Sequence, residues 1–309
     1  MRYIITLDDF DMEVSTINLN YIVKPNEEGQ KISHILRDKL NISARLLTKL
    51  KMNEKILVNS KSVFSSYIVH SGDNITVKID FEEEDNIEAQ KMKLEILYED
   101  EFLLAVSKPA GIVVHPSSYH PNNTLANGVK HYLNNKKKIR AINRLDRDTS
   151  GIVLFAKNEY VQELMIQDKT IEKEYLAIVT GLLKEKQGTI NKPIARKEGS
   201  IMERQVNEEV GQTAITHYDV LEEDSDLNIS VVHIKLETGR THQIRVHFSY
   251  IKNSILGDTL YGFETKLINR QALHAWKLSF VHPITTEKIE ILARLPDDME
   301  KLINKNRNI

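Results

Sequence analysis

The amino-acid sequence predicts an α+β fold with a small N-terminal α+β module ahead of a larger, strand-rich domain. Apolar residues recur at helical spacing in the first part of the chain, and strand-like runs with occasional helices dominate from about residue 92. An acidic stretch of low hydrophobicity, 82–88, separates the two patterns. We therefore expect an N-terminal extension over 1–29, the small module over 30–80, an acidic linker over 81–91 and the large domain over 92–309.

The small module opens with two predicted helices. Ile32, Leu36 and Leu40 are spaced by four, which predicts one apolar helix face. Ser43 is a candidate N-cap for a second helix that runs through Leu50. Strands are then expected over 56–58 and 75–79, with a turn at 72–73.

The large domain is predicted to be rich in strands. We expect strands over 94–98, 102–107, 151–156, 175–179, 231–236 and 273–280, and a helix over 160–171. The last two strands partly alternate apolar and polar residues, so each should bury one face. The strands do not alternate regularly with helices, which favours an α+β arrangement over a βαβ series.

The composition excludes several kinds of chemistry. The chain has no cysteine, so disulfides, thiolate zinc sites and cysteine nucleophiles are excluded. The first ten residues lack the pattern of a signal peptide, and the uncharged run 109–129 is too polar to span a membrane. We therefore expect a cytoplasmic protein with no membrane contact.

Charge is distributed unevenly although the net charge is only −2. Residues 31–80 carry nine positive and four negative side chains, whereas residues 81–100 carry two positive and eight negative. Nucleic acids respond to local basic patches more than to the total charge. The basic block therefore suggests a nucleic acid as the partner of the module, although an ordinary uneven surface gives the same count.

The segment 144–151 combines carboxylates and guanidinium groups. It interleaves Asp146 and Asp148 with Arg144 and Arg147. An arginine beside a carboxylate favours its ionised form, and an ionised aspartate is what a nucleophile or a base requires. Taken alone, the same spacing also fits a surface loop with compensating ion pairs.

A second polar segment, 236–250, runs from a strand end into a predicted helix that begins near Thr241. On that helix Thr241 and Arg245 would share a face. Arg245 could project into a cleft, where its planar fork suits a carboxylate or a phosphate; a surface ion pair fits equally well. His242 and His247 are five apart and share no helical face, so packing or hydrogen bonding is favoured over a metal site.

Two further segments could contact a ligand. Two prolines and a glycine predict an irregular loop over 108–116, which would either cover a ligand or only connect two strands. Tyr175 enters a strand, where it could pack in the core or stack on a flat base. Basic residues lead into and flank Asp146, which suggests that a polyanion lies across a site containing a carboxylate. They are Lys136, Lys137, Lys138, Arg140, Arg144 and Arg147.

Taken together, these segments resemble the pseudouridine synthases of the large ribosomal-subunit (Rlu) type. The H-R-L-D-x-x-T-S-G segment of that family corresponds to 143–151 of this chain. The K-P-x-G-x-x-V-H-P loop, the K-x-Y strand and the T-G-R-T-H-Q-I-R-V-H segment correspond to 108–116, 173–175 and 238–247. The match continues through 257–262 and 273–283 and spans about 92–296. The resemblance implies a mixed, mainly antiparallel sheet in the catalytic domain.

The module also resembles a known domain. Residues 31–80 resemble the RNA-binding module first seen in a small-subunit ribosomal protein, through segments 42–50 and 69–75. Two departures from these families stand out. Glycines that are usual in the turns of the module are replaced near Asn53 and Lys61. Asn143 stands where the synthase family usually has histidine, and an asparagine keeps a donor and an acceptor but cannot titrate.

The resemblance implies isomerisation of specific uridines to pseudouridine in structured RNA, ribosomal or transfer RNA, without cofactor or metal. It assigns catalysis to Asp146, with Arg245 pairing and orienting it and Tyr175 either only stacking on the flipped uracil or also helping to remove the carbon 5 proton. We expect a monomer because the partner is a large RNA. The residues expected to contact RNA are Arg144, Arg147, Lys108, Arg240, His115, Arg45, Lys49 and Lys51. Two alternatives are a non-catalytic RNA-binding or ribosome-assembly factor on the same fold, and a glycosidase that uses Asp146 with Asp148.

Overall fold

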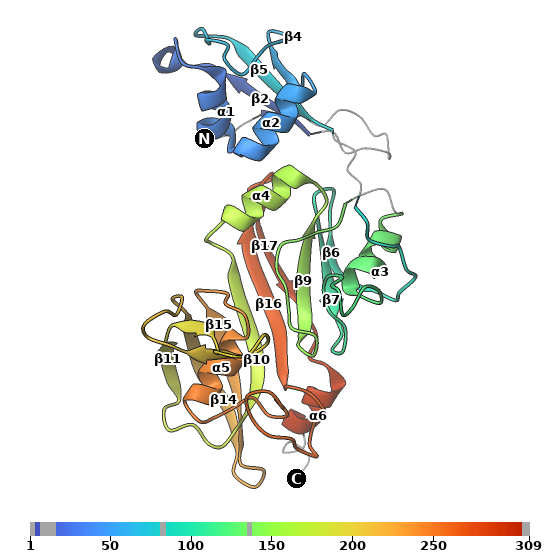
Figure 1. Ribbon diagram of the computed structural model, residues 1–309, viewed down its shortest axis with the longest axis vertical. Coiled ribbons are helices and arrows are strands. Elements are labelled where there is room, and N and C mark those ends of the chain that lie inside the picture. The colour runs from blue at the N-terminus through green and yellow to red at the C-terminus, as the bar shows by residue number, and fades with distance from the viewer. Residues whose placement is uncertain (1–3, 7–16, 81–84, 135–137, 305–309) are drawn as a thin grey trace.

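The computed structural model describes residues 4–6, 17–80, 85–134 and 138–304. It has a small sheet module at one end and a long, twisted sheet that makes up most of the remaining chain (Figure 1). Helix α4 lies between the two parts (Figure 1).

The module is built on a five-stranded sheet with the order β1-β2-β5-β3-β4. Its elements are β1 (Ile4–Thr6), β2 (Ile17–Ile22), a 3₁₀ turn (Pro25–Glu27), α1 (Ile32–Leu40), α2 (Ala44–Met52), β3 (Ile56–Val58), β4 (Lys61–Ser62) and β5 (Asn74–Ile79). Both predicted helices and both predicted strands are confirmed, and Ser43 caps α2 by accepting a hydrogen bond from the Leu46 N–H.

The expected boundary at residue 30 is wrong. Strand β2 pairs with β5 along its whole length, and Ile17 and Leu19 are fully buried. The module therefore begins at Ile17 or earlier, and 17–29 is no separate extension. Single-sequence reasoning missed this strand because its partner β5 lies more than 50 residues downstream.

The large domain is a ten-stranded sheet whose main path runs β11-β14-β15-β10-β16-β9-β7-β6. All of its strand pairs are antiparallel except β9 with β16. The expected α+β class with a mixed, mainly antiparallel sheet is confirmed. Its strands are β6 (Glu95–Glu99), β7 (Leu103–Lys108), β8 (Arg140–Ala141), β9 (Ser150–Ala156), β10 (Glu172–Thr180), β11 (Gln187–Asn191), β14 (Ile215–Asp224), β15 (Ile229–Leu236), β16 (Leu273–Val281) and β17 (Lys288–Leu292).

Helices and a small hairpin complete the large domain. They are α3 (Leu125–Tyr132), α4 (Glu159–Gln167), α5 (Gln243–Tyr250), α6 (Asp297–Asn304) and the pair β12 (Ile194–Arg196) with β13 (Arg204–Val206). Within the described residues, no helix combines the length and apolar character needed to cross a bilayer.

The parallel pair at the middle of the sheet depends on a glycine. Gly151 pairs with Ala275 across β9 and β16, and its φ of +114° is rarely adopted by other residues. A Cβ at this position would lie 2.2 Å from the carbonyl oxygen of Ala275. Glycine therefore lets the two strands meet directly beside the segment that carries Asp146.

The module and the large domain share one hydrophobic core, which continues through α4. Tyr160 of α4 is buried, and its hydroxyl donates a hydrogen bond of 2.9 Å to the carbonyl of Leu40 at the end of α1. Ser43 donates to Glu163 of α4 at 2.6 Å. The junction is thus a packed interface with internal hydrogen bonds.

The prediction of a solvated linker over 81–91 is wrong at Asp85, which lies in the described part of that stretch. Asp85 pairs with Lys130 of α3 at 3.0 Å, and both side chains are largely buried. Its carboxylate also accepts a hydrogen bond from the Ile139 N–H. Asp85 therefore fastens the chain to the large domain, whereas residues 81–84 lie outside the described part of the chain.

Candidate active site

A cavity of about 630 Å³ lies in the large domain and gathers most of the polar segments singled out in the sequence. Its lining comes from the loop before α3, the segment that leads into β9, strand β10, the junction of β15 with α5, and one residue of β16. The lining residues are Val113–Ser117, Ala141–Asp146, Thr149, Lys173, Tyr175, Leu236, Gly239–Arg245 and Leu273.

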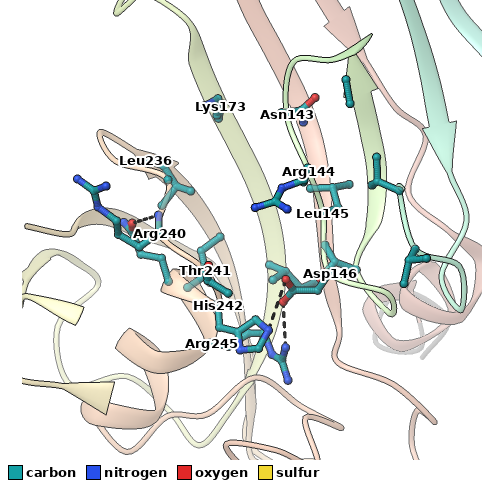
Figure 2. Close-up of a pocket in the computed structure, with 18 of the residues that line it drawn as sticks. Asn143, Arg144, Leu145, Asp146, Lys173, Leu236, Arg240, Thr241, His242 and Arg245 are labelled. Carbon is teal, nitrogen blue, oxygen red and sulfur yellow. Dashed lines mark hydrogen bonds and ion pairs between the residues drawn. The ribbon is translucent and has the colours of Figure 1, made fainter. Parts of the chain in front are cut away.

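Asp146 and Arg245 meet on one side of this cavity although they are 99 residues apart (Figure 2). The guanidinium Nη1 of Arg245 donates to Oδ2 of Asp146 at 2.9 Å. On its other edge Arg245 donates to both oxygens of Asp258, at 2.6 and 2.8 Å. Arg245 is thus clamped by a fully buried carboxylate and presents its remaining edge to Asp146, whose side chain is 27% exposed.

The electrostatics favour a charged Arg245. Burial opposes its positive charge, but the hydrogen bonds and charges of Asp258 and Asp146 outweigh burial, so the pKa of Arg245 is raised. The guanidinium also lies 5.0 Å from the centre of the Tyr261 ring. A permanently charged, fixed donor beside Asp146 suits a carboxylate that must stay ionised in a partly enclosed cavity.

The start of α5 differs from the expected pattern. The helix begins at Gln243, and His242 before it has a positive φ of +58°. Thr241 therefore lies outside the helix, and its expected helical spacing to Arg245 is wrong. The left-handed turn brings His242 beside Asp146, with Nε2 3.7 Å from Oδ1.

His247 has an ordinary structural role. One ring nitrogen contacts the Thr216 hydroxyl at 2.8 Å, and the other contacts the Lys192 carbonyl at 2.9 Å. This confirms the expectation of hydrogen bonding for His247. Among the described residues, no three histidine or carboxylate side chains gather as a metal site would require.

Asn143 supports the segment that carries Asp146. Its amide donates to the Ile152 carbonyl at 3.0 Å and accepts from the Leu154 N–H at 2.8 Å. The side chain thus extends the pairing of β8 with β9 and lies apart from Asp146 (Figure 2). In this structure the residue at the usual histidine position ties a loop to a strand, which an amide does without titrating.

Lys108 is a correction to the expected RNA contacts. It is fully buried, and its ammonium donates to the carbonyls of Pro109, Ile112 and Arg147 at 2.8–2.9 Å. Burial lowers the pKa of Lys108 to about 7, while the charges of Asp148 and Asp146 oppose the shift. With every proton donated inward, Lys108 joins the 109–112 loop to the Asp146 segment and cannot reach RNA.

Only one of the two neighbouring carboxylates lines the cavity. Asp146 lines it, whereas Asp148 is forked by the adjacent Arg147, with contacts of 2.9–3.2 Å. Arg147 does not line the cavity either. This pair is the compensating ion pair that the sequence also allowed, and it removes the paired carboxylates that a glycosidase would need.

Tyr175 and Lys173 project from the same face of β10 into the cavity. Tyr175 is 9% exposed, and burial together with the charge of Asp146 raises its pKa, so its hydroxyl stays protonated at neutral pH. Burial lowers the pKa of Lys173. No described residue forms a hydrogen bond or ion pair with the Lys173 ammonium. Lys173 was not among the residues expected to contact RNA.

The remaining expected RNA contacts lie in three places. Arg144, His115 and Arg240 line the cavity, and Arg144 reaches into the space between the Asp146 segment and the 240–242 turn (Figure 2). Arg45 and Lys49 of α2 instead pair with Glu159 of α4, at 3.3 Å each. Lys51 is exposed on the module.

Asp258 and Tyr261 had no expected role in the sequence, and His242 was expected only to pack or to form hydrogen bonds, although all three help to build the site. Asp258 and Tyr261 lie in the 257–262 segment, which matched the family pattern but has no spacing that predicts a contact with Arg245. The left-handed conformation of His242 breaks helical periodicity, so its position beside Asp146 could not be read from the sequence.

Comparison with known proteins gives two family matches. Residues 102–250 match the family described as RNA pseudouridylate synthase, and residues 19–75 match the N-terminal domain of the ribosomal pseudouridine synthase RluD. The second match includes most of β2, in keeping with its place in the module's sheet.

Individual relatives cover nearly the whole chain. The RNA pseudouridine synthase YhcT of Bacillus subtilis is 39% identical over 290 residues, which is 92% of this chain and 96% of that protein. Ribosomal large subunit pseudouridine synthase D of Vibrio parahaemolyticus is 34% identical over 92% of this chain and 93% of its own length. The solved structure of human RNA Pseudouridylate Synthase Domain Containing 1 has a similar fold, with a TM-score of 0.55 at 24% identity, covering 74% of this chain and 98% of that one.

Proposed function

Because this chain belongs to the family of RNA pseudouridine synthases, we propose that it isomerises specific uridines of structured ribosomal RNA, with Asp146 as its nucleophile. Ribosomal RNA is favoured over transfer RNA because a relative that matches almost end to end is named for the large ribosomal subunit. The match of residues 19–75 to a ribosomal synthase N-terminal domain favours the same substrate class. We propose that the protein acts in the cytoplasm, as a monomer on a much larger partner.

The observation that carries the assignment is the geometry of Asp146. Its carboxylate lines the cavity, and one oxygen, Oδ2, is fixed by Arg245, which Asp258 clamps from behind. The other oxygen, Oδ1, has no hydrogen bond of ordinary length from a described residue; the Nε2 of His242 lies 3.7 Å from it. A carboxylate that is oriented through one oxygen and open at the other suits a nucleophile.

The cavity has the features needed for a flipped nucleotide. A uridine inside folded RNA must leave its stack to reach Asp146, at a cost of about a few kcal/mol. We propose that Tyr175 stacks on the uracil, and that Arg144, Arg240, His115 and Lys173 contact flanking phosphates, which offsets the cost. Since Tyr175 keeps its proton at neutral pH, we assign it to stacking and not to removal of the carbon 5 proton.

No cofactor is required by the chemistry. The base leaves ribose through nitrogen 1 and rejoins it through carbon 5, so substrate and product are isomers and no electrons are exchanged. We propose that 17–80 delivers the RNA and that 92–309 carries out the reaction. The basic side chains of the module that stay available for RNA then include Lys51 and Arg45, which is 76% exposed despite its ion pair with Glu159, whereas Lys49 is largely covered.

Asp146→Asn tests the proposal. The amide keeps the shape of the side chain but removes its charge, so we expect pseudouridine formation to fall by at least about 10⁴-fold while RNA binding changes little. The measurement is pseudouridine mapping after incubation with ribosomal RNA from cells that lack the protein. Asp148→Asn is the matched control and should keep nearly full activity, because Asp148 does not line the cavity.

Three outcomes would overturn parts of the proposal. Full activity of Asp146→Asn would remove Asp146 as nucleophile. An inactive wild type that still binds ribosomal RNA would favour the alternative, a non-catalytic RNA-binding or assembly factor. Activity on transfer RNA alone would correct the substrate while leaving the chemistry in place.

A further inference from the structure

His242 occupies a position beside Asp146 that the proposed reaction does not yet use. Its side chain is 14% exposed, and its Nε2 lies 3.7 Å from Oδ1 of Asp146 (Figure 2). Its Nδ1 lies 2.8 Å from the hydroxyl of Tyr261, and the two rings meet edge to face. The residue is held in the left-handed region, with φ +58°, where a residue other than glycine or asparagine is costly.

The hydrogen bonds around Tyr261 determine which nitrogen of His242 carries the proton. The Tyr261 hydroxyl oxygen accepts the backbone N–H of Arg204 at 2.8 Å. Its own proton is then free to be donated to Nδ1 of His242 at 2.8 Å. An acceptor at Nδ1 means that neutral His242 carries its proton on Nε2, the nitrogen that faces Asp146.

Tyr261 is itself rigidly placed. Its backbone N–H is bound by Asp258, and its carbonyl accepts from the Ser249 hydroxyl of α5 at 2.7 Å. Its ring packs against the Arg245 guanidinium. The same tyrosine therefore supports both groups that face the Asp146 carboxylate, Arg245 on one oxygen and His242 near the other.

We propose that His242 is a positioning residue for Asp146: as the Nε2–H tautomer fixed by Tyr261, it holds Oδ1 while Arg245 holds Oδ2. The inference rests on the proposed role of Asp146 as nucleophile. In the RNA-free protein the 3.7 Å contact is longer than a hydrogen bond. It shortens when RNA fills the cavity, as catalytic contacts often do on substrate binding. The contact from His242 uses one lone pair of Oδ1 and fixes the carboxylate plane, while the other lone pair of Oδ1 stays open to the cavity for attack.

Burial, more than the surrounding charges, lowers the pKa of His242 and favours its neutral form at neutral pH. Five groups face it: Asp146, Arg245, Arg204, Asp258 and Tyr261. Burial lowers the pKa of His242 below its usual 6.5, the two arginines lower it further, and the two aspartates oppose them. At a pH below the His242 pKa, a second proton would bind Nδ1 and face the Tyr261 hydroxyl, which already accepts from Arg204. The ring would then also carry a positive charge beside Oδ1 of Asp146. The reaction rate should therefore fall on the acid side.

Two substitutions separate the contribution of the Nε2–H donor from that of the rest of the His242 side chain. His242→Gln places an amide N–H near the Nε2 position and does not titrate. His242→Asn tolerates the positive φ and can still contact Tyr261, but it is too short to reach Asp146. Single-turnover rates are measured as tritium release from carbon 5 of uridine in labelled ribosomal RNA, from pH 5 to pH 8, with RNA affinity measured in parallel.

We expect His242→Asn to slow the reaction by about tenfold or more, with RNA affinity within about threefold of wild type. His242→Gln should recover most of the lost rate and lack the acid-side fall in rate that we expect of the wild type, whose His242 pKa is lowered by burial. Equal rates for His242→Asn and wild type would overturn the inference, as would an unchanged acid limb in His242→Gln. Because Asp146→Asn is assayed on the same RNA, failure of this inference is distinguishable from failure of the proposed function.

A second measurement needs no RNA and no activity. In protein labelled with ¹⁵N-histidine, the His242 signals are identified by their loss in His242→Gln. We expect a protonated Nε2 and an unprotonated Nδ1 at pH 7, and loss of this tautomer preference in Tyr261→Phe. A protonated Nδ1 at pH 7 would overturn the inference even if the Asp146→Asn and His242→Asn variants fail to fold.

Discussion

A single guanidinium lies between two carboxylates at the centre of the site, and its fork is what lets it serve both. Arg245 uses Nε and Nη2 for Asp258 and keeps Nη1 for Asp146. A lysine ammonium is a single point charge and cannot reproduce this division. The Arg245–Asp258 pair is almost completely buried, so a partner left unpaired would be costly.

Arg245→Lys should therefore damage both stability and rate. We expect a loss of about 3 kcal/mol in the free energy of unfolding, measured in urea, because one buried carboxylate oxygen loses its donor. The single-turnover rate should fall by about 100-fold, because Asp146 is no longer held.

The control for this prediction is Arg147→Lys. Arg147 also forks a carboxylate, but its side chain is 57% exposed. Its replacement should change stability by less than about 0.5 kcal/mol. If the two variants lose equal stability, burial of the Arg245 fork is not what makes it important.

The sequence predicted Asp146, Tyr175 and Arg245 through motifs, and the fold brings all three to one cavity. The predictions from the sequence failed for residues whose role depends on burial or on backbone conformation. Lys108 was expected to contact RNA, but the 109–112 loop and the Asp146 segment enclose it completely. His242 was missed because a single left-handed residue replaces the expected helical turn.

At the level of elements, the parallel contact between β9 and β16 joins the two halves of the large sheet. The register places Ser150 beside His274 and Gly151 beside Ala275. Such pairings join segments more than 120 residues apart. The strands β6, β7, β9, β10, β15 and β16 were predictable from local apolar runs, whereas β8, β11, β14 and β17 were not expected. Neither the pairing of β9 with β16 nor the bulges in β6, β14 and β16 could be predicted, because register depends on distant partners.

Gly151→Ala should separate these strands. The added Cβ would lie 2.2 Å from the oxygen and 2.6 Å from the nitrogen of Ala275, both of them backbone atoms that cannot rotate away. We expect a loss of about 2–5 kcal/mol in the free energy of unfolding, measured in urea. Activity should fall as well, since Asp146 lies five residues before Gly151 in the same segment.

Gly199→Ala provides the matched control. Gly199 has a positive φ of +74° but nothing within 4 Å of an added Cβ. Its replacement should cost only about 1 kcal/mol, the strain of the backbone alone. An equal cost at both glycines would show that the close approach of β9 and β16 contributes nothing.

At the scale of the whole molecule, the module and the large domain form one packed body through α4. Their cores are continuous, and α2 contributes Ser43, Arg45 and Lys49 to hydrogen bonds and ion pairs with α4. The sequence predicted two units and a basic module. It could not predict that part of this basic surface is used within the protein, because that depends on how the units pack.

Tyr160→Ala should uncouple the two units. Tyr160 is buried at the junction and donates to Leu40. Its removal should cost about 3–5 kcal/mol and split one unfolding transition into two, followed by circular dichroism and by tryptophan fluorescence of the large domain. Ile166→Ala on the same helix is 61% exposed in the wild type and should leave a single transition. Two transitions in the wild type would contradict a shared core.

The distance along the chain between Asp146 and Arg245 has a consequence for the timing of activity during synthesis. The two residues are separated by 99 positions. A ribosome adding ~5–20 residues per second needs ~5–20 s to make that stretch. A nascent chain that has already exposed its aspartate therefore lacks the arginine that orients it. On the proposed mechanism, the protein therefore cannot modify RNA until synthesis has passed Arg245, and a product that ends before Arg245 should be inactive as a synthase.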